Sequence, residues 1–401
     1  MSGLISLTEA RQHILDACET LPVEQCALSE ILGRTLAEDI VASHNQPAAD
    51  ISAMDGYAVR LDDCAIGKGL QLAGEARAGN PFQGPLNAGQ AVRISTGAYV
   101  PEGADHILIQ EEAERADETL TPTVQQSPNG FIRAKGRDFA NGDTLLTAGT
   151  PLAPASIALC AAAGLAQLPV IRKPRVAILT NGDELCEPGE PLRPGALYDS
   201  NGPALAAQIT HWGAISGWQG RGGDDMTAMI QCFKQAQGHD LLIIAGGASV
   251  GPHDIVRDAF VEEGGELIFS RIAVKPGKPA WCGRLGRTLV IGLPGNPASA
   301  FVTAELLVKP AVAKMLGQQA QAMLSLSSAI AGKPLPKNGP RESFLRAVVS
   351  EDAAGRRIVT PASDQDSSLL RPLAMANALL HLAPHAPPVD EGKPVAFLPL
   401  A

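Results

Sequence analysis

The sequence predicts a multidomain α/β protein built around one doubly wound α/β domain. Between residues 176 and 299, five short apolar runs each end in a loop that carries glycine and polar or charged residues. This pattern is typical of strands whose carboxyl ends face a ligand crevice. On both sides of this region, apolar residues alternate in short runs separated by glycine and proline, which favours β-rich domains. A chain of 401 residues is also longer than one ordinary domain.

The N-terminal part is predicted to be helical at its edges and β-rich in its middle. Ser6 and Glu9 have capping-box spacing before a helix, whose apolar face is Ala10, Ile14, Ala17, Cys18 and Leu21. Residues 29–38 are expected to form a second short helix, and residues 155–166 an alanine-rich one. Because short alternating runs fill 47–141, we expect a β-rich domain inserted into a domain made of 1–46 and 142–172.

The α/β domain is expected to span residues 173–325. Its apolar runs are 176–180, 214–218, 240–245, 267–274 and 288–293, and its loops are 181–184, 220–225, 246–251 with Asp254, 275–278 and 294–297. A closing helix is predicted over 298–315. Residues 326–401 alternate again, which predicts a small C-terminal β-barrel domain.

Composition excludes several classes of function. The formal net charge of -10 argues against general binding to nucleic acid or membrane surfaces. Seven scattered cysteines without a C-x-x-C pair indicate neither a disulfide framework nor a zinc site. The charged first helix is no signal peptide, and no apolar run is long enough to cross a bilayer. We therefore expect a cytoplasmic protein.

Acidic side chains follow several of the predicted strands: Asp183, Glu184, Asp224, Asp225 and Asp254. Carboxylates that cluster repel one another unless a cation joins them. Mg²⁺ is the expected cation, since it prefers oxygen ligands and shares them with substrate phosphates. The alternative is that acids such as Asp225 and Asp254 only cap the helices that follow.

Glycine and lysine loops predict a site for an anion. Gly246, Gly247 and Gly251, with Ser249 between them, follow the most apolar run, and backbone amides at such a turn can hold a phosphate. The loop 275–278 brings two lysines together next to a proline. The alternatives are a ligand-free turn for the first loop and a solvated surface loop for the second.

Taken in order, several segments resemble one known family. They are SAMDGYA at 52–58, STGA at 95–98, VPEGAD at 100–105, TNGDEL at 180–185, GGASVG at 246–251, KPGKP at 275–279 and LPGNPAS at 293–299. As a set, they are similar to molybdopterin molybdenumtransferases, the family that includes the C-terminal domain of gephyrin. The chain departs from the family at Tyr99, Arg137 and Ala245, and its C-terminal domain matches more loosely.

The resemblance implies a reaction and an assembly. Adenylylated molybdopterin, molybdate and Mg²⁺ enter, and the molybdenum cofactor and AMP leave. An elongated homodimer is implied, with a cleft shared by the α/β domain of one subunit and the β-rich domain of the other. A molybdopterin adenylyltransferase and molybdoenzymes are the expected pathway partners. Two alternatives stay open: an adenylyltransferase, and a non-catalytic cofactor-binding or scaffold protein.

The site residues follow from matching positions and from the loops above. The predicted catalytic residues are Asp55, Thr96, Asp138, Glu184, Asp224 and Asp254, of which Glu184, Asp224 and Asp254 would hold Mg²⁺. The predicted substrate-binding residues are Gly246, Gly247, Ser249, Gly251, Lys275, Lys278, Pro294, Gly295, Asn296, Pro297, Arg133, Arg346 and Ser367. Asp55 and Thr96 are expected to place molybdate or the incoming water.

Overall fold

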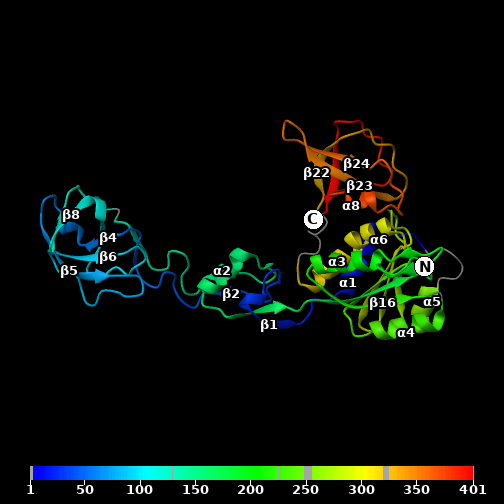
Figure 1. Cartoon of the computed structure of the whole chain (residues 1–401), viewed down its shortest axis with the longest axis horizontal. Coiled ribbons are helices and arrows are strands. Elements are labelled where there is room, and N and C mark those ends of the chain that lie inside the picture. The colour runs from blue at the N-terminus through cyan, green and yellow to red at the C-terminus, as the bar shows by residue number, and fades with distance from the viewer. Residues whose placement is uncertain (1–2, 129, 224, 248–254, 319–324, 401) are drawn as a thin grey trace. The chain divides into compact units, whose positions relative to one another are not determined.

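The structure is a computed structural model that describes residues 3–128, 130–223, 225–247, 255–318 and 325–400. It consists of two compact units, Met1–Gln25 with Gly33–Ala37 and Pro169–Ala401, and Cys26–Leu32 with Glu38–Leu168. Figure 1 shows the elements of each unit. The chain passes between the units within β1 (Val23–Ala27) and β12 (Gln167–Ile171), and also after Leu32 and after Ala37. Within the described ranges, no helix is long and apolar enough to span a membrane.

The first helix begins where its capping box predicts. Helix α1 spans Leu7–Ala17, and the Ser6 side chain accepts a hydrogen bond from the Glu9 backbone while the Glu9 carboxylate accepts from the Ser6 backbone. These reciprocal bonds satisfy two amides that a helix start otherwise leaves unpaired. Ala10 and Ile14 are fully buried. The predicted face is therefore confirmed within the helix, although Cys18 and Leu21 lie beyond its end.

The predicted second helix over 29–38 is wrong. Only a 3-10 turn, η1 (Leu28–Glu30), forms there. Gly33 follows with φ +72°, a left-handed conformation that an α-helix does not contain and that glycine adopts at no steric cost. The chain then runs in extended form toward β2 (Ile40–Val41).

The second unit contains a curled six-stranded sheet with a buried core on each face. Its strands, in spatial order, are β7 (His106–Ile109), β4 (Gly56–Val59), β6 (Gln90–Ile94), β5 (Leu70–Ala76), β9 (Thr119–Pro122) and β8 (Ala113–Ala116). Tyr57 and Val59 belong to one cluster and Ala58 to the other, as expected when successive side chains of a strand face opposite sides.

Short elements complete this unit. They are η2 (Leu61–Asp63), η3 (Gln110–Glu112), β3 (Ile51–Ser52) paired with β10 (Ile132–Arg133), β11 (Thr144–Leu146) paired with β2, and α2 (Pro154–Ala162). Helix α2 begins at Pro154. Proline costs no hydrogen bond there, because an N–H group at the first helical position has no acceptor within the helix. It ends just before Gly164, at φ +76°, so the alanine-rich helix is confirmed with a shorter C-terminus.

The α/β domain is a six-stranded sheet with helices on both faces, as predicted. Its strands, in spatial order, are β16 (Ile215–Gly222), β13 (Arg175–Asn181), β17 (Leu241–Ala245), β21 (Thr288–Leu293), β20 (Trp281–Leu285) and β18 (Glu266–Phe269). The first four run parallel, whereas β20 is antiparallel to both of its neighbours. Two more short strands, β14 (Leu185–Cys186) and β15 (Leu197–Tyr198), pair outside this sheet.

Alternate residues of each strand pack on opposite faces of this sheet. Ile178 and Ile243 pack with α1, α3 (Asn201–His211) and the 297–315 helical segment. Leu179 and Ile244 pack instead with α4 (Met226–Ala236) and α5 (Ile255–Glu262). Figure 1 shows α3 and α6 on one side of the sheet and α4 and α5 on the other. Burial of both faces explains why the central strands β13, β17 and β21 are mostly apolar.

Two details of the α/β domain differ from the prediction. The predicted strand 267–274 is split, because β18 ends at Phe269 and Lys275 follows in a separate short strand, β19 (Val274–Lys275). The predicted closing helix consists of α6 (Pro297–Thr303), a π-helical turn η4 (Ala304–Val308) and α7 (Lys309–Met315). Pro310 has no N–H to donate, which accounts for the altered hydrogen bonding before it.

The C-terminal part is a closed five-stranded barrel, as predicted. The strands follow one another around it as β23 (Glu342–Glu351), β24 (Arg357–Pro361), β22 (Ser327–Ala331), β26 (Pro394–Pro399) and β25 (Ala378–Leu382), and β25 pairs again with β23. A short helix, α8 (Arg371–Ala374), precedes β25. Strand β19 adds to the barrel by pairing with β23. The boundaries proposed above for four domains stay a prediction.

Candidate anion site at the carboxyl edge of the sheet

The carboxyl ends of the four parallel strands meet at one edge. After β17, Gly246 packs so closely on the backbone carbonyl of Asn181 that no Cβ would fit. A Cβ on Gly295, after β21, would lie 3.4 Å from the Cα of Gly246. With its amide nitrogen facing β16, the Asn181 side chain donates to the carbonyls of Gly222 and Gly223 at 3.3 and 3.2 Å. Residues of four of the loops that the sequence assigned to one crevice are therefore adjacent.

Of the predicted magnesium ligands, only Glu184 lies within the described residues. Its carboxylate is exposed, folds back over Gly182 and makes no hydrogen bond or ion pair with any described residue. The described part of the chain holds no group of three His, Cys, Asp or Glu side chains suited to a metal. Asp224, Ser249, Gly251 and Asp254 lie outside the described residues, so the magnesium set stays a prediction.

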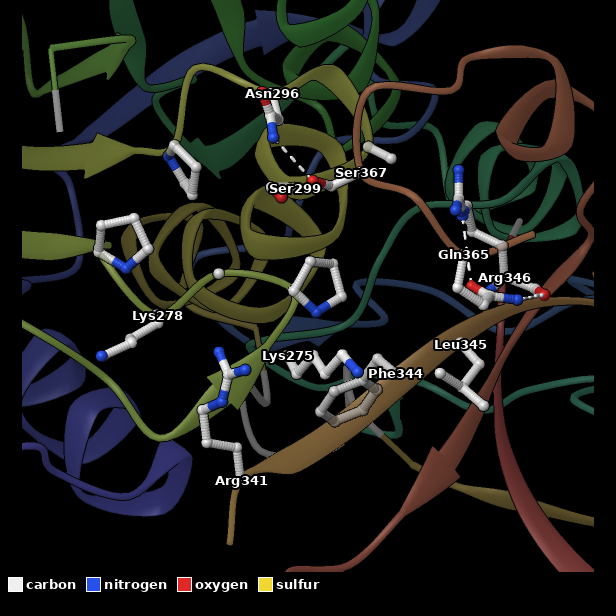
Figure 2. Close-up of a pocket in the computed structure, with 15 residues that line it drawn as sticks. Lys275, Lys278, Asn296, Ser299, Arg341, Phe344, Leu345, Arg346, Gln365 and Ser367 are labelled. Atoms are coloured by element: carbon white, nitrogen blue, oxygen red, sulfur yellow. Dashed lines mark hydrogen bonds between the residues drawn. The ribbon is translucent and has the colours of Figure 1, made fainter. Parts of the chain in front are cut away.

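A cavity of about 330 Å³ lies beside this edge, between the α/β domain and the barrel. Six of the predicted substrate-binding residues line it (Figure 2): Lys275, Lys278, Pro294, Asn296, Arg346 and Ser367. Arg341 also lines it, so the described part of the wall carries four cationic side chains and no acidic one. In a protein with a formal net charge of -10, such a wall gives a local field that attracts anions.

The two lysines of this cavity have free ammonium groups. Both side chains are exposed, and neither makes a hydrogen bond or ion pair with a described residue. Lys275 ends β19, where it pairs with Ser343 of the barrel strand β23. The pairing fixes the lysine loop against the barrel, and the ammonium groups stay available for a ligand.

A hydrogen-bonded contact joins the proline turn of the α/β domain to a barrel loop. Asn296 donates from Nδ2 to Ser367 Oγ at 2.7 Å, drawn in Figure 2, and Ala298 donates its backbone N–H to the Ser367 carbonyl at 3.0 Å. Pro297 opens α6 at this point. Ser367 therefore closes one wall of the cavity, with its hydroxyl at the cavity surface.

Arg346 also lines the cavity, but its N–H groups donate hydrogen bonds to other groups of the protein. The residue is 2% exposed. Its guanidinium donates to the carbonyls of Leu369 at 2.7 Å, Asp366 at 2.9 Å and Asp364 at 3.3 Å, and to the side chain of Gln365. Burial lowers the pKa of Arg346 from its ordinary value. These bonds hold the 364–369 loop that carries Ser367, and direct ligand binding by Arg346 stays a prediction.

Asp199 and Asn201 belong to this region, and the sequence analysis missed both. Asp199 is buried; it accepts a hydrogen bond from Thr180 Oγ1 at 2.7 Å and from the first two backbone amides of α3 at 3.0 Å. Asn201 then donates to the Gly295 carbonyl at 2.7 Å. The signal was Asp199 and Ser200 directly before a helix that begins at Asn201, a pattern that also fits ordinary capping.

Replacement of Asn201 by alanine tests this link. We expect Asn201→Ala to lower the free energy of unfolding by about 1 kcal/mol, the usual net value of one hydrogen bond, and to weaken anion binding severalfold because the 294–297 turn loses its tether. Urea denaturation and calorimetric titration with pyrophosphate would measure the two effects. Unchanged affinity would show that the turn holds its position without Asn201.

The remaining predicted residues lie in the second unit. Asp55 Oδ1 accepts hydrogen bonds from the backbone N–H and the hydroxyl of Thr96 at 2.7 and 3.0 Å. Arg133 is exposed on β10, whose pairing with β3 brings it toward the segment that carries Asp55. Asp138 is exposed, and its backbone N–H donates to Gln46. The structure thus brings Asp55 and Thr96 into direct contact.

The Asp55 carboxylate should respond to pH in a defined way. The hydrogen bonds from Thr96 lower the pKa of Asp55 from its ordinary value of 3.8. Because the folded-state pKa is depressed, the ionised carboxylate stabilises the protein above pH 3.8, and this contribution is lost as pH falls through the folded-state value. We expect Asp55→Asn to remove this pH-dependent stabilisation. The difference in free energy of unfolding between wild type and variant, measured by urea denaturation, should therefore disappear at the lowest pH. A difference that is constant with pH would contradict the assignment.

Comparisons with known proteins agree with this architecture. The family model of the MoeA N-terminal region (domain I and II) matches residues 5–164, that of a probable molybdopterin binding domain matches 177–314, and that of the MoeA C-terminal region (domain IV) matches 328–400. A molybdopterin molybdenumtransferase of Haemophilus influenzae is 38% identical over 99% of this chain and 98% of its own. A molybdopterin molybdenumtransferase of Bacillus subtilis is 34% identical over 98% of this chain and 94% of its own.

Solved structures give the same result. Two crystal structures of the molybdopterin biosynthesis MoeA protein of Pyrococcus horikoshii have TM-scores of 0.87 and 0.83 to this chain, at 29% and 28% identity. They cover 100% and 99% of this chain, and 100% of their own chains in both cases. The order of inserted β-rich segment, α/β domain and C-terminal barrel is therefore shared over the full length.

The architecture is that of a multidomain α/β protein, and the curated relatives that it matches over nearly their full length are transferases. More specifically, the chain belongs to the molybdopterin molybdenumtransferase family. The resemblance drawn from the sequence motifs is thereby confirmed.

Proposed function

We propose that this protein inserts molybdenum from molybdate into adenylylated molybdopterin, with release of AMP and the molybdenum cofactor. The observation that carries the proposal is the cavity whose described lining has four cationic side chains, no acidic one and two ammonium groups without a partner among the described residues. Adenylylated molybdopterin is an anion with a phosphoanhydride link. Lys275 and Lys278 would bind its phosphate oxygens, and the Pro294–Asn296 turn would shape the adjoining wall.

The reaction breaks one bond of the phosphoanhydride. Water supplies oxygen to phosphorus, and AMP leaves. The two thiol sulfur atoms of the pterin, which are soft ligands of molybdenum, displace oxygen from molybdate, and that oxygen leaves as water with the thiol protons. The residues of this chain would orient the two anions and offset their mutual repulsion. Asp55 and Thr96 would place molybdate or the attacking water, since their mutual hydrogen bonds fix both groups on the β-rich unit.

Mg²⁺ is part of the proposal. The exposed carboxylate of Glu184, without a partner among the described residues, has the hard oxygen donors that Mg²⁺ prefers, and Asp224 and Asp254 would complete the set. A bound Mg²⁺ would neutralise charge on the leaving phosphate.

We also propose that the protein works as a homodimer with a shared cleft, which mass measurement under native conditions tests.

The reaction itself is tested by incubating the purified protein with adenylylated molybdopterin, molybdate and Mg²⁺. AMP release that requires molybdate supports the proposal. Formation of adenylylated molybdopterin from molybdopterin and ATP would identify an adenylyltransferase instead. Tight binding without AMP release would identify a cofactor-binding or scaffold protein.

A further inference from the structure

Among the described residues that line the cavity, Arg341 is the one cation that the sequence motifs did not point to. It lies directly before β23 and is half-buried. Figure 2 shows its guanidinium on the same side of the cavity as Lys275 and Lys278. Its neighbour Glu342 interacts with His381 at 2.8 Å and not with Arg341. No carboxylate among the described residues forms an ion pair with Arg341.

The guanidinium of Arg341 has unused donors. A guanidinium carries five N–H donors in a planar fork. The only hydrogen bond that the guanidinium makes with a described residue runs from Nη1 to the Val274 carbonyl at 3.4 Å, which is long for such a bond. The guanidinium of Arg346, by contrast, donates its N–H groups to backbone carbonyls of its own domain. Among the described residues of this cavity, the guanidinium with unused donors is therefore that of Arg341.

Three cations without a counter-ion among the described residues are costly to hold together. Lys275, Lys278 and Arg341 repel one another, and a half-buried charge without a partner loses hydration. A fork geometry matches two oxygens of a phosphate, whereas an ammonium acts as a point charge. An anion bound here would offset the repulsion and receive both kinds of contact.

We propose that Arg341 is a further binding residue of this cavity, which grips two oxygens of a phosphate or phosphoanhydride group. The proposal rests on the proposed function, because it assigns to Arg341 the same anionic group that Lys275 and Lys278 bind. Its consequence is selectivity: the cavity favours a phosphoanhydride, with several charged oxygens, over a singly charged carboxylate.

The test is calorimetric titration of the full-length protein with inorganic pyrophosphate. Arg341→Gln removes the charge but keeps an amide donor for the Val274 carbonyl, so it separates ligand binding from a structural role. We expect roughly tenfold to hundredfold weaker binding and a shallower dependence of affinity on salt. Arg341→Lys keeps the charge without the fork. We expect its loss of pyrophosphate affinity to be about half that of Arg341→Gln on a logarithmic scale.

Matched variants make each outcome decisive. Arg357→Gln removes an exposed arginine of the same barrel that does not line the cavity, and should bind as wild type. Unchanged affinity in Arg341→Gln together with weaker binding in Lys275→Ala would overturn the role of Arg341 and leave the proposed function intact. Unchanged affinity in both would show that the cavity is not the anion site. If Arg341→Gln is unfolded by circular dichroism, full pyrophosphate affinity in Arg341→Lys would still refute the fork.

Discussion

Replacement of both Lys275 and Lys278 by alanine is expected to weaken binding of adenylylated molybdopterin by about a hundredfold. A hydrogen bond to a charged group contributes roughly 1.5–3 kcal/mol. Because both ammonium groups are exposed and water screens them, the lower limit applies to each. Two such losses sum to about 3 kcal/mol, and every 1.4 kcal/mol changes affinity by about tenfold. Fluorescence titration with the pterin compound would measure the change.

The control for this variant is a second double replacement, Lys333→Ala with Lys337→Ala. It removes the same charge from a segment that does not line the cavity. We expect it to bind as wild type at moderate salt. An equal loss in both double variants would mean that only the overall field attracts the substrate, and no loss in the first would remove the lysines from the site.

Replacement of Glu184 by alanine is expected to slow AMP release by about a hundredfold or more while the protein stays folded. Even residues that only support metal ligands typically cost 10–100-fold when replaced, and a ligand itself should cost at least as much. Since the carboxylate is exposed and unpaired among the described residues, the free energy of unfolding should change by less than about 0.5 kcal/mol. Initial rates of AMP release over a series of Mg²⁺ concentrations would measure the effect.

An exposed glutamate of the barrel, Glu391, provides the comparison for Glu184. Glu391→Ala should show wild-type rates and wild-type dependence on Mg²⁺. If Glu184→Ala reaches normal turnover at low Mg²⁺, the carboxylate does not hold the metal. If the rate recovers only when Mg²⁺ is raised, the loss lies in metal affinity, as the proposal requires.

Local sequence signals predicted much of the fold because they act within a few residues. The capping box at Ser6 and Glu9 fixed the start of α1, and the apolar runs at 176–180 and 240–245 became β13 and β17. The same reasoning failed at 29–38, where Gly33 in a left-handed conformation prevented a helix. It also missed β20, whose partner β21 follows it after a two-residue turn at Gly286 and Arg287.

The site was predictable only in part, since its geometry depends on contacts between distant segments. Lys275 and Lys278 stood out as a pair, and Asn181 and Gly246 as ends of strands. Nothing in the sequence showed that Lys275 would leave the main sheet and pair with the barrel. Arg341 gave no signal because it lies 66 residues further along the chain, and only the fold brings it into one cavity with Lys275.

The central claim is that the cavity between the lysine loop and the barrel holds the phosphoanhydride of the substrate. A crystal structure of the protein with adenylylated molybdopterin tests it most directly. We expect phosphate oxygens within salt-bridge distance of the Lys275 and Lys278 ammonium groups and of the Arg341 guanidinium. A pterin compound bound elsewhere, with this cavity filled by water alone, would contradict the account.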